Sequence, residues 1–209
     1  MLSLEIHTAY GPARAHLHVD ERSPAALILG HGAGGGVQAP DLVAATKAAR
    51  AQAVSVALVE QPYHVAGRRS PARVPQLDAA WIAVIQCLRA GELAGLPLVV
   101  GGRSMGARVA CRTARTTGAV AVLCLAFPLQ PPHRAGKPAQ SRLAELDAVT
   151  VPTLVVQGER DPFGIPPAGP AREVAKVPGD HSLKADIEAV AAAVRAWIPG
   201  VVAAAASVA

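Results

Sequence analysis

The chain has 209 residues, of which 51% are hydrophobic and 17% are charged, and this composition excludes a mostly disordered protein. Its length fits one domain with a substantial core. The formal net charge is +5, yet the basic residues are dispersed apart from Arg68 and Arg69, with Arg73 nearby, and aromatic residues make up only 3%, so we expect no nucleic-acid partner.

Cysteine content and the N-terminal segment predict the cellular setting. Cys87, Cys111 and Cys124 lie in apolar segments, which favours buried, reduced thiols over disulfides or a metal site. Residues 1–7 lack the basic and apolar regions of a signal peptide, and no apolar run approaches the length of a membrane span. We therefore expect a cytoplasmic protein with no membrane contact.

Predicted strands and helices alternate along almost the whole chain. A hairpin is expected within residues 2–20, and the later apolar runs predict buried strands separated by amphipathic helices. This alternation predicts an α/β protein, a three-layer sandwich on a mostly parallel sheet, with one domain at 1–199 and an apolar tail at 200–209. The later strands are expected at 25–29, 54–59, 98–100, 120–126, 153–157 and 172–177, and the helices at 41–50, 76–90, 105–117, 141–146 and 185–197.

In the predicted hairpin, His16 and His18 share one polar face. Two imidazoles on one face could bind a metal ion, but their alternation with apolar residues favours the exposed face of an edge hairpin. We therefore predict no metal site.

A glycine-rich loop at 30–36 follows a predicted strand and has two interpretations. Its sequence Gly-His-Gly-Ala-Gly-Gly has the spacing of the dinucleotide-binding motif, and Glu60 stands near the position of the acid in that motif, but the next helix begins only near residue 40. The favoured alternative is an oxyanion loop, whose small residues let backbone N–H groups point at a developing negative charge.

Two polar loops are expected at the carboxyl ends of strands, where a parallel sheet places its ligand crevice. The loop at 61–71 carries Tyr63, His64 and Arg68 as candidate substrate contacts, although a plain connecting loop is equally consistent with its sequence. The proline-rich loop after the strand at 120–126 carries His133, for which an exposed position is favoured over a role as base.

The segment Gly102-Arg103-Ser104-Met105-Gly106 joins an apolar strand to a helix. A serine hydroxyl becomes an effective nucleophile when a tight turn exposes it beside a base, and flanking glycines let two backbones approach closely. The segment therefore predicts a nucleophile elbow. The alternative is a glycine-rich turn whose serine only caps the helix.

Two later loops carry an acid and a base in the chain order of the α/β-hydrolase scaffold. Asp161 and His181 each follow a predicted strand, so both are expected at the same sheet edge as Ser104. His181 would transfer the proton, and Asp161 would orient the imidazole. Asp180 is a rival acid and Glu159 a weaker one, but a residue adjacent to the histidine points poorly toward its ring.

An oxyanion hole is predicted at the N–H of Met105 together with the N–H of Ala33 or Gly32. His31 is expected to support the glycine-rich loop. Arg103 flanks the nucleophile and is a further candidate substrate contact.

Four motifs give the chain a family resemblance, and they lie at 27–36, 101–108, 158–164 and 179–182. Together they resemble the small α/β-hydrolases of the testis-expressed and NSL-complex-subunit-like family, which is more distantly similar to dienelactone hydrolases. The likeness covers nearly the whole chain, including its Glu-Gln-Pro-Tyr loop.

This resemblance implies an α/β-hydrolase fold without a large lid domain and a triad of Ser104, Asp161 and His181. It implies no particular substrate. Ala107 stands where the family pattern has glycine, a small change. Dienelactone hydrolases carry cysteine at the position of Ser104, so their activity is not transferred to this chain.

The sequence therefore predicts a serine hydrolase that cleaves a small ester or related acyl bond through an acyl-enzyme, with no cofactor. A non-catalytic scaffold or interaction protein is one alternative, and a dinucleotide-binding protein is a weaker one. The sequence does not decide whether Arg68 and Arg69 select acidic substrates, and it does not predict the oligomeric state.

Overall fold

The computed structural model describes residues 2–131 and 140–207. Within these residues, eight strands form one sheet in the order β1-β2-β4-β3-β5-β6-β7-β8. The strands from β4 to β8 in this order are parallel, whereas β1 and β2 form antiparallel pairs. Their bounds are β1 Leu2–Thr8, β2 Gly11–His18, β3 Ala26–Gly30, β4 Ser55–Glu60, β5 Leu98–Arg103, β6 Ala121–Leu125, β7 Thr153–Gly158 and β8 Arg172–Val177.

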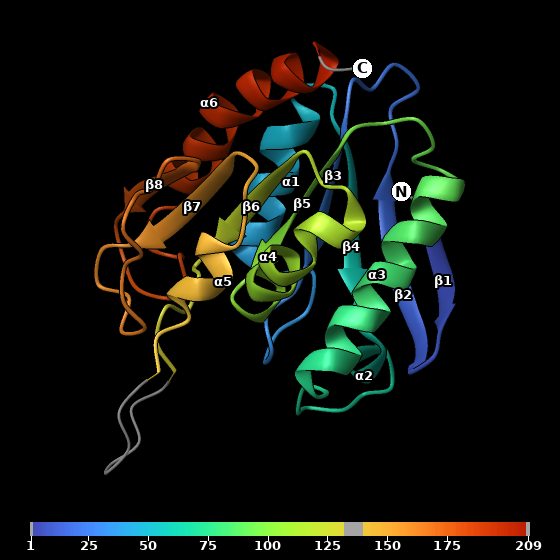
Figure 1. The fold of residues 1–209 in the computed structure, drawn as a ribbon, viewed down its shortest axis with the longest axis horizontal. Helices are drawn as coiled ribbons and strands as arrows, with labels where there is room; N and C mark the ends of the chain where they lie inside the picture. The colour runs from blue at the N-terminus through green and yellow to red at the C-terminus, as the bar shows by residue number, and fades with distance from the viewer. Residues whose placement is uncertain (1, 132–139, 208–209) are drawn as a thin grey trace.

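The helices within the described residues are α1 Pro40–Arg50, α2 Pro62–Val65, α3 Val74–Ala90, α4 Met105–Thr117, α5 Leu143–Asp147 and α6 Ile187–Ala206. Helices α1 and α6 pack together on one face of the sheet, and α3 and α4 pack on the other (Figure 1). The two faces of the sheet thus contribute to two separate hydrophobic clusters. This arrangement confirms the predicted three-layer α/β architecture.

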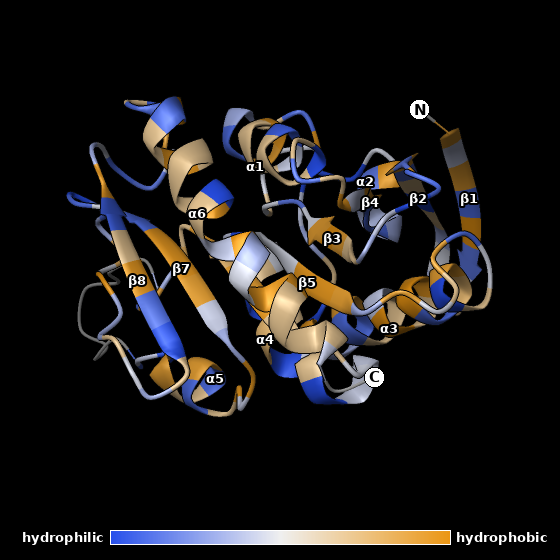
Figure 2. Ribbon diagram, turned by 90° about the horizontal axis from the view of Figure 1, so that it is seen from above, coloured by the Kyte–Doolittle hydropathy of each residue, from blue (hydrophilic) through white to orange (hydrophobic). Residues whose placement is uncertain are grey.

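The central strands are apolar along their length because helices bury both of their faces. Every residue of β3 and β6 is buried. By contrast, β8 lies at the sheet edge and carries Arg172, Glu173 and Lys176, so that much of it is blue in Figure 2. Charges on an edge strand hinder its pairing with another chain.

Two segments and one cysteine differ from the sequence prediction. The loop predicted at 61–71 contains the short helix α2, which starts with Pro62 in its first turn. Helix α6 continues to Ala206 instead of ending at Trp197, because burial of Val201 and an alanine-rich continuation offset the helix-breaking tendency of Pro199. Cys87 is exposed, contrary to the prediction.

Helix α6 also corrects the prediction that no apolar run approaches the length of a membrane span. Its 20 residues include an 18-residue window of mean hydropathy 1.7, of which 28% is buried. The helix is therefore long and apolar enough to cross a membrane by length and composition. Because a core helix meets the same criterion, and α6 packs against α1, this is weak evidence for a span.

Candidate active site

Ser104 occupies the turn between β5 and α4 in a backbone conformation that is rare for a residue with a side chain, with φ of 52° and ψ of −105°. Gly102 and Gly106 permit this turn. A Cβ atom on either glycine would collide with the carbonyl oxygen of Gly30 in the neighbouring strand β3. The close approach that the two glycines predict is therefore present.

Ser104, His181 and Asp161 form a hydrogen-bonded chain at the carboxyl ends of β5, β8 and β7. His181 Nε2 lies 3.0 Å from Ser104 Oγ, and His181 Nδ1 lies 2.8 Å from Asp161 Oδ2. The Asp161 side chain has no exposed surface, and the ring of Phe163 packs edge-on against the imidazole. A carboxylate partner places the imidazole proton on Nδ1, so that Nε2 faces the serine as an acceptor.

Gln157, in the buried strand β7, contacts this site although it was not predicted from the sequence. Its buried Nε2 lies 2.7 Å from Asp161 Oδ2, and it also lies 3.1 Å from the carbonyl oxygen of Phe127 and 3.0 Å from that of Gly164. The N–H of Phe163 donates to the other carboxylate oxygen at 2.8 Å. The signal for Gln157 was a polar residue at the end of a buried strand.

The rival acids lie elsewhere. Asp180 is fully exposed and accepts hydrogen bonds from the N–H and hydroxyl of Ser182 at 2.9 and 2.7 Å, which lower the pKa of its carboxyl group. Glu159 is also exposed. Of the three acids considered, Asp161 contacts the ring of His181. The candidate base His133 lies outside the described residues.

His31 is buried and holds the glycine-rich loop in place. Its Nδ1–H donates to the carbonyl of Gly32 at 2.7 Å, and its Nε2 accepts from the N–H of Gln61 at 3.1 Å. Burial lowers the pKa of His31, which favours the neutral ring that this pair of bonds requires. The loop is thereby tied to the segment that follows β4.

The predicted oxyanion donors lie next to Ser104. A Cβ atom on Gly32 would lie 3.7 Å from the Cβ of Ser104, so the glycine-rich loop borders the serine. The Tyr63 hydroxyl donates to the carbonyl of Ala33 at 3.1 Å, and burial raises the pKa of Tyr63 to about 12, so the phenol keeps its proton. Within the described residues, no acceptor is bonded to the N–H of Ala33 or Met105. Both amides are therefore unpaired within the described part of the chain, and their role as oxyanion donors stays a prediction.

Arg103 contacts the side chain of Asp41 and the backbone of His181. Its Nε lies 2.8 Å from Asp41 Oδ2, and its Nη2 donates to the carbonyl of His181 at 3.0 Å. Asp41 is fully buried in the first turn of α1, where burial raises the pKa of its carboxyl group and the Arg103 charge opposes that rise. This pairing was not predicted from the sequence, and a substrate contact by Arg103 stays a prediction.

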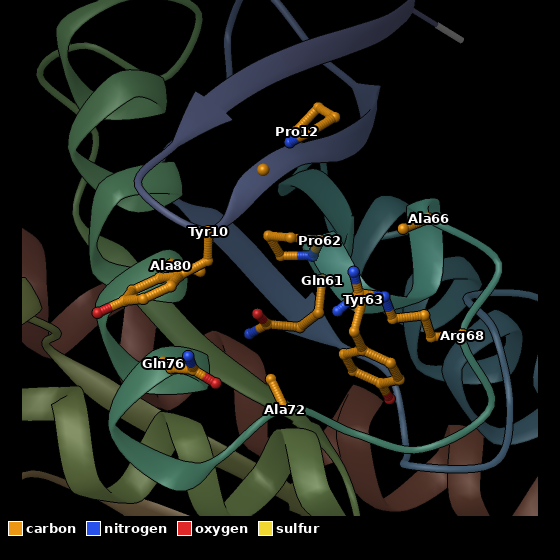
Figure 3. Close-up of a pocket in the computed structure, with 11 residues that line it drawn as sticks. Tyr10, Pro12, Gln61, Pro62, Tyr63, Ala66, Arg68, Ala72, Gln76 and Ala80 are labelled. Carbon is orange, nitrogen blue, oxygen red and sulfur yellow. The ribbon is translucent and has the colours of Figure 1, made fainter.

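The other candidate contacts line two cavities. Tyr63 is 4% exposed, and its ring borders a cavity of about 250 Å³ between the β-hairpin, α2 and α3, together with Gln61 and Arg68 (Figure 3). His64 packs against His31 with the two rings tilted and their centroids 4.6 Å apart. His64 and Arg68 also line a second cavity beside Ala33.

The contacts of Glu60 bear on the dinucleotide interpretation. Its carboxylate lies 3.7 Å from each of Arg14, His16 and His64, while the glycine-rich loop borders Ser104. The acid that the motif would use is thus paired with basic side chains. Within the described residues, no group of three or more potential metal ligands occurs.

Comparison with known proteins gives one family and several similar structures. A family model described as alpha/beta hydrolase domain matches residues 23–194. Est1E from Butyrivibrio proteoclasticus, which has also been solved with ferulic acid bound, has a TM-score of 0.78 at 15% identity, covering 96% of this chain and 99% of Est1E. A search of curated protein sequences found no match.

Two further structures are similar over almost their whole length. A serine hydrolase without a lid from Xanthomonas campestris has a TM-score of 0.76 at 18% identity, covering 95% of this chain and 94% of the other. A dienelactone hydrolase from Anabaena variabilis has a TM-score of 0.75 at 14% identity, covering 95% and 96%. At these identities the likeness concerns the fold.

Proposed function

The chain belongs to the alpha/beta hydrolase domain family and has the α/β-hydrolase fold, and from this premise we propose that it is a serine hydrolase of small esters or related acyl compounds. The observation that carries the proposal is the chain of contacts from Ser104 Oγ to His181 Nε2 at 3.0 Å and from His181 Nδ1 to Asp161 Oδ2 at 2.8 Å. This arrangement joins a nucleophile, a base and an orienting acid.

In the proposed acylation, Ser104 Oγ bonds to the substrate carbonyl carbon while its proton passes to His181 Nε2. The carbonyl electron pair moves onto oxygen, where the N–H groups of Met105 and Ala33 stabilise the charge. Asp161 stabilises the imidazolium. Collapse of the tetrahedral intermediate then breaks the bond to the leaving group, which takes the proton from His181.

Deacylation repeats the same steps with water. His181 Nε2 accepts a proton from water as the water oxygen bonds to the acyl carbon. The second tetrahedral intermediate breaks its bond to Ser104 Oγ, which regains its proton from the imidazolium. The acid product then leaves, and the free enzyme is restored.

We further propose that the substrates are small or exposed acyl compounds. Support comes from the similar lidless hydrolase and from Est1E, which binds ferulic acid. Cytoplasmic location, action without a cofactor, and relationship to the testis-expressed and NSL-complex-subunit-like proteins belong to the same proposal, on the sequence features given above.

A fluorophosphonate probe tests the function directly, because it reacts with an activated serine. We expect wild-type protein to be labelled and to hydrolyse p-nitrophenyl acetate, and Ser104→Ala to do neither while keeping its circular dichroism spectrum. A folded wild-type protein that is never labelled and hydrolyses no ester would contradict the proposal and favour a non-catalytic scaffold.

A further inference from the structure

A cavity of about 500 Å³ opens beside the predicted oxyanion loop. It is lined by Ala33 and Gly34 of that loop and by His64, Gly67, Arg68 and Arg69 from the segment after β4. Its volume lies within the range of small-molecule sites, roughly 300–1,000 Å³. Because Ala33 is also the proposed oxyanion donor, the cavity adjoins the proposed oxyanion hole.

The cavity lining is basic. No aspartate or glutamate lines it, and within the described residues neither Arg68 nor Arg69 forms an ion pair. His64 differs, because its Nδ1 lies 3.7 Å from Glu60. The two arginines thus supply positive charge that no ion pair within the described residues compensates.

The turn that presents the arginines is anchored to the oxyanion loop. Gly67 adopts a left-handed conformation with φ of +71°, and its N–H bonds to the carbonyl of His64 at 2.9 Å. The N–H of Arg68 bonds to the carbonyl of Tyr63 at 2.9 Å, and the hydroxyl of the same tyrosine bonds to the carbonyl of Ala33. Tyr63 therefore links the backbone of Arg68 to the loop that carries the proposed oxyanion donor Ala33.

We propose that Arg68 and Arg69 form a subsite for a negatively charged group of the substrate, a carboxylate or a phosphate, so that the enzyme prefers anionic esters over neutral ones. Guanidinium groups bind both kinds of oxyanion through paired hydrogen bonds. This inference rests on the proposed hydrolase function. It adds the substrate class, which neither the family nor the similar structures assign.

Matched substrates test the subsite. p-Nitrophenyl hydrogen glutarate carries a free carboxylate, its methyl ester is a neutral control, and a p-nitrophenyl acyl ester ending in a phosphate tests the other anion. We expect wild-type protein to show a lower KM for at least one anionic ester than for the neutral one. The more strongly affected anion identifies the group that the arginines recognise.

Variants locate the effect. Arg68→Ala/Arg69→Ala is expected to raise KM for the preferred anionic ester about tenfold to a hundredfold, the loss expected for charge-assisted hydrogen bonds. Its kcat, and its KM for the neutral ester, should stay within about twofold of wild type. The control Arg22→Ala/Arg115→Ala removes the same charge from exposed positions outside the cavity and should change neither KM.

Failure of the subsite and failure of the hydrolase function give different results. If the neutral ester is hydrolysed and removal of Arg68 and Arg69 leaves every KM unchanged, the subsite is wrong and the hydrolase stands. If no ester is hydrolysed, the hydrolase is wrong, and binding of glutarate and inorganic phosphate to Ser104→Ala decides the subsite. Binding that disappears with the two arginines supports it, and binding that is absent or unchanged overturns it.

Discussion

Arg103 Nη2 donates to the backbone carbonyl of His181 at 3.0 Å, so the residue before the candidate nucleophile directly holds the loop of the candidate base. The same guanidinium is paired with Asp41, whose side chain has no exposed surface. One side chain therefore connects the turn after β5, the start of α1 and the loop after β8. The contact between Ser104 and His181 depends on the relative position of two of these segments.

Replacing Arg103 should impair both stability and catalysis. Arg103→Ala leaves the buried carboxylate of Asp41 without its partner, and loss of one member of a buried ion pair costs about 3–5 kcal/mol of unfolding free energy. Arg103→Lys keeps the charge but not the planar guanidinium that contacts both Asp41 and the carbonyl of His181, so we expect a smaller loss of stability and a lower kcat. Urea unfolding and ester hydrolysis measure the two effects.

A double-mutant cycle with Asp41→Asn provides the control. The double variant Asp41→Asn/Arg103→Ala should be more stable than Arg103→Ala alone, because it removes the unpaired buried charge. Equal stability of the two variants would show that Asp41 needs no charge compensation from Arg103.

Asp161→Asn should abolish most activity. In the Ser-His-Asp mechanism, asparagine in place of the acid stabilises the wrong imidazole tautomer and lowers kcat by about 10⁴-fold. Asp180→Asn should leave kcat within about twofold, because Asp180 bonds to Ser182 and not to the imidazole. Turnover of p-nitrophenyl acetate compares the variants, and the reverse ranking would make Asp180 the catalytic acid.

Gln157→Leu should lower kcat by about tenfold, because Asp161 loses the donor that holds its Oδ2 atom. The carbonyls of Phe127 and Gly164 lose the same donor, so the unfolding free energy should fall by about 1–3 kcal/mol. The exposed Gln52→Leu is a control of identical chemistry. An unchanged kcat in a Gln157→Leu protein that has lost stability would assign Gln157 a purely structural role.

The positions of Ser104, Asp161 and His181 at one edge of the sheet could be predicted because strands and helices alternate along most of the chain, which indicates a mostly parallel sheet. Each residue follows a predicted strand, and parallel strands bring their carboxyl ends to the same edge. The glycines that flank Ser104 indicate that two backbone segments approach closely there. Both features can be recognised in the sequence without knowing the order of the strands in the sheet.

Gln157 and Asp41 could not be placed in the same way. Their contacts join segments far apart in the sequence. A glutamine near the end of a strand and an aspartate in the first turn of a helix can each be explained by the local secondary structure alone, so neither residue stands out in the sequence as part of a site. The end of α6 was unpredictable for a related reason. Burial of Val201 against the domain core decides whether the helix continues past Pro199, and burial depends on the complete fold.

His31 should make the unfolding free energy depend on pH. Burial lowers the pKa of its imidazole in the folded protein below the unfolded value of 6.5, so the unfolded chain binds the proton more readily. The stability that depends on neutral His31 is therefore fully present above pH 6.5 and is lost as the pH falls through the folded pKa. Each proton taken up on unfolding contributes a slope of at most about 1.4 kcal/mol per pH unit.

The measurement is urea unfolding of wild type and His31→Gln from about pH 8 to about pH 5. The variant should be less stable at the upper pH, because glutamine replaces both hydrogen bonds of the ring imperfectly, and its stability should fall less steeply below pH 6.5. His18, whose pKa burial also lowers, contributes a slope of the same sign, so His18→Gln is the matched control. Parallel curves for wild type and His31→Gln would mean that His31 does not bind a proton on unfolding, and its proposed role as a neutral acceptor for Gln61 would then lose its support.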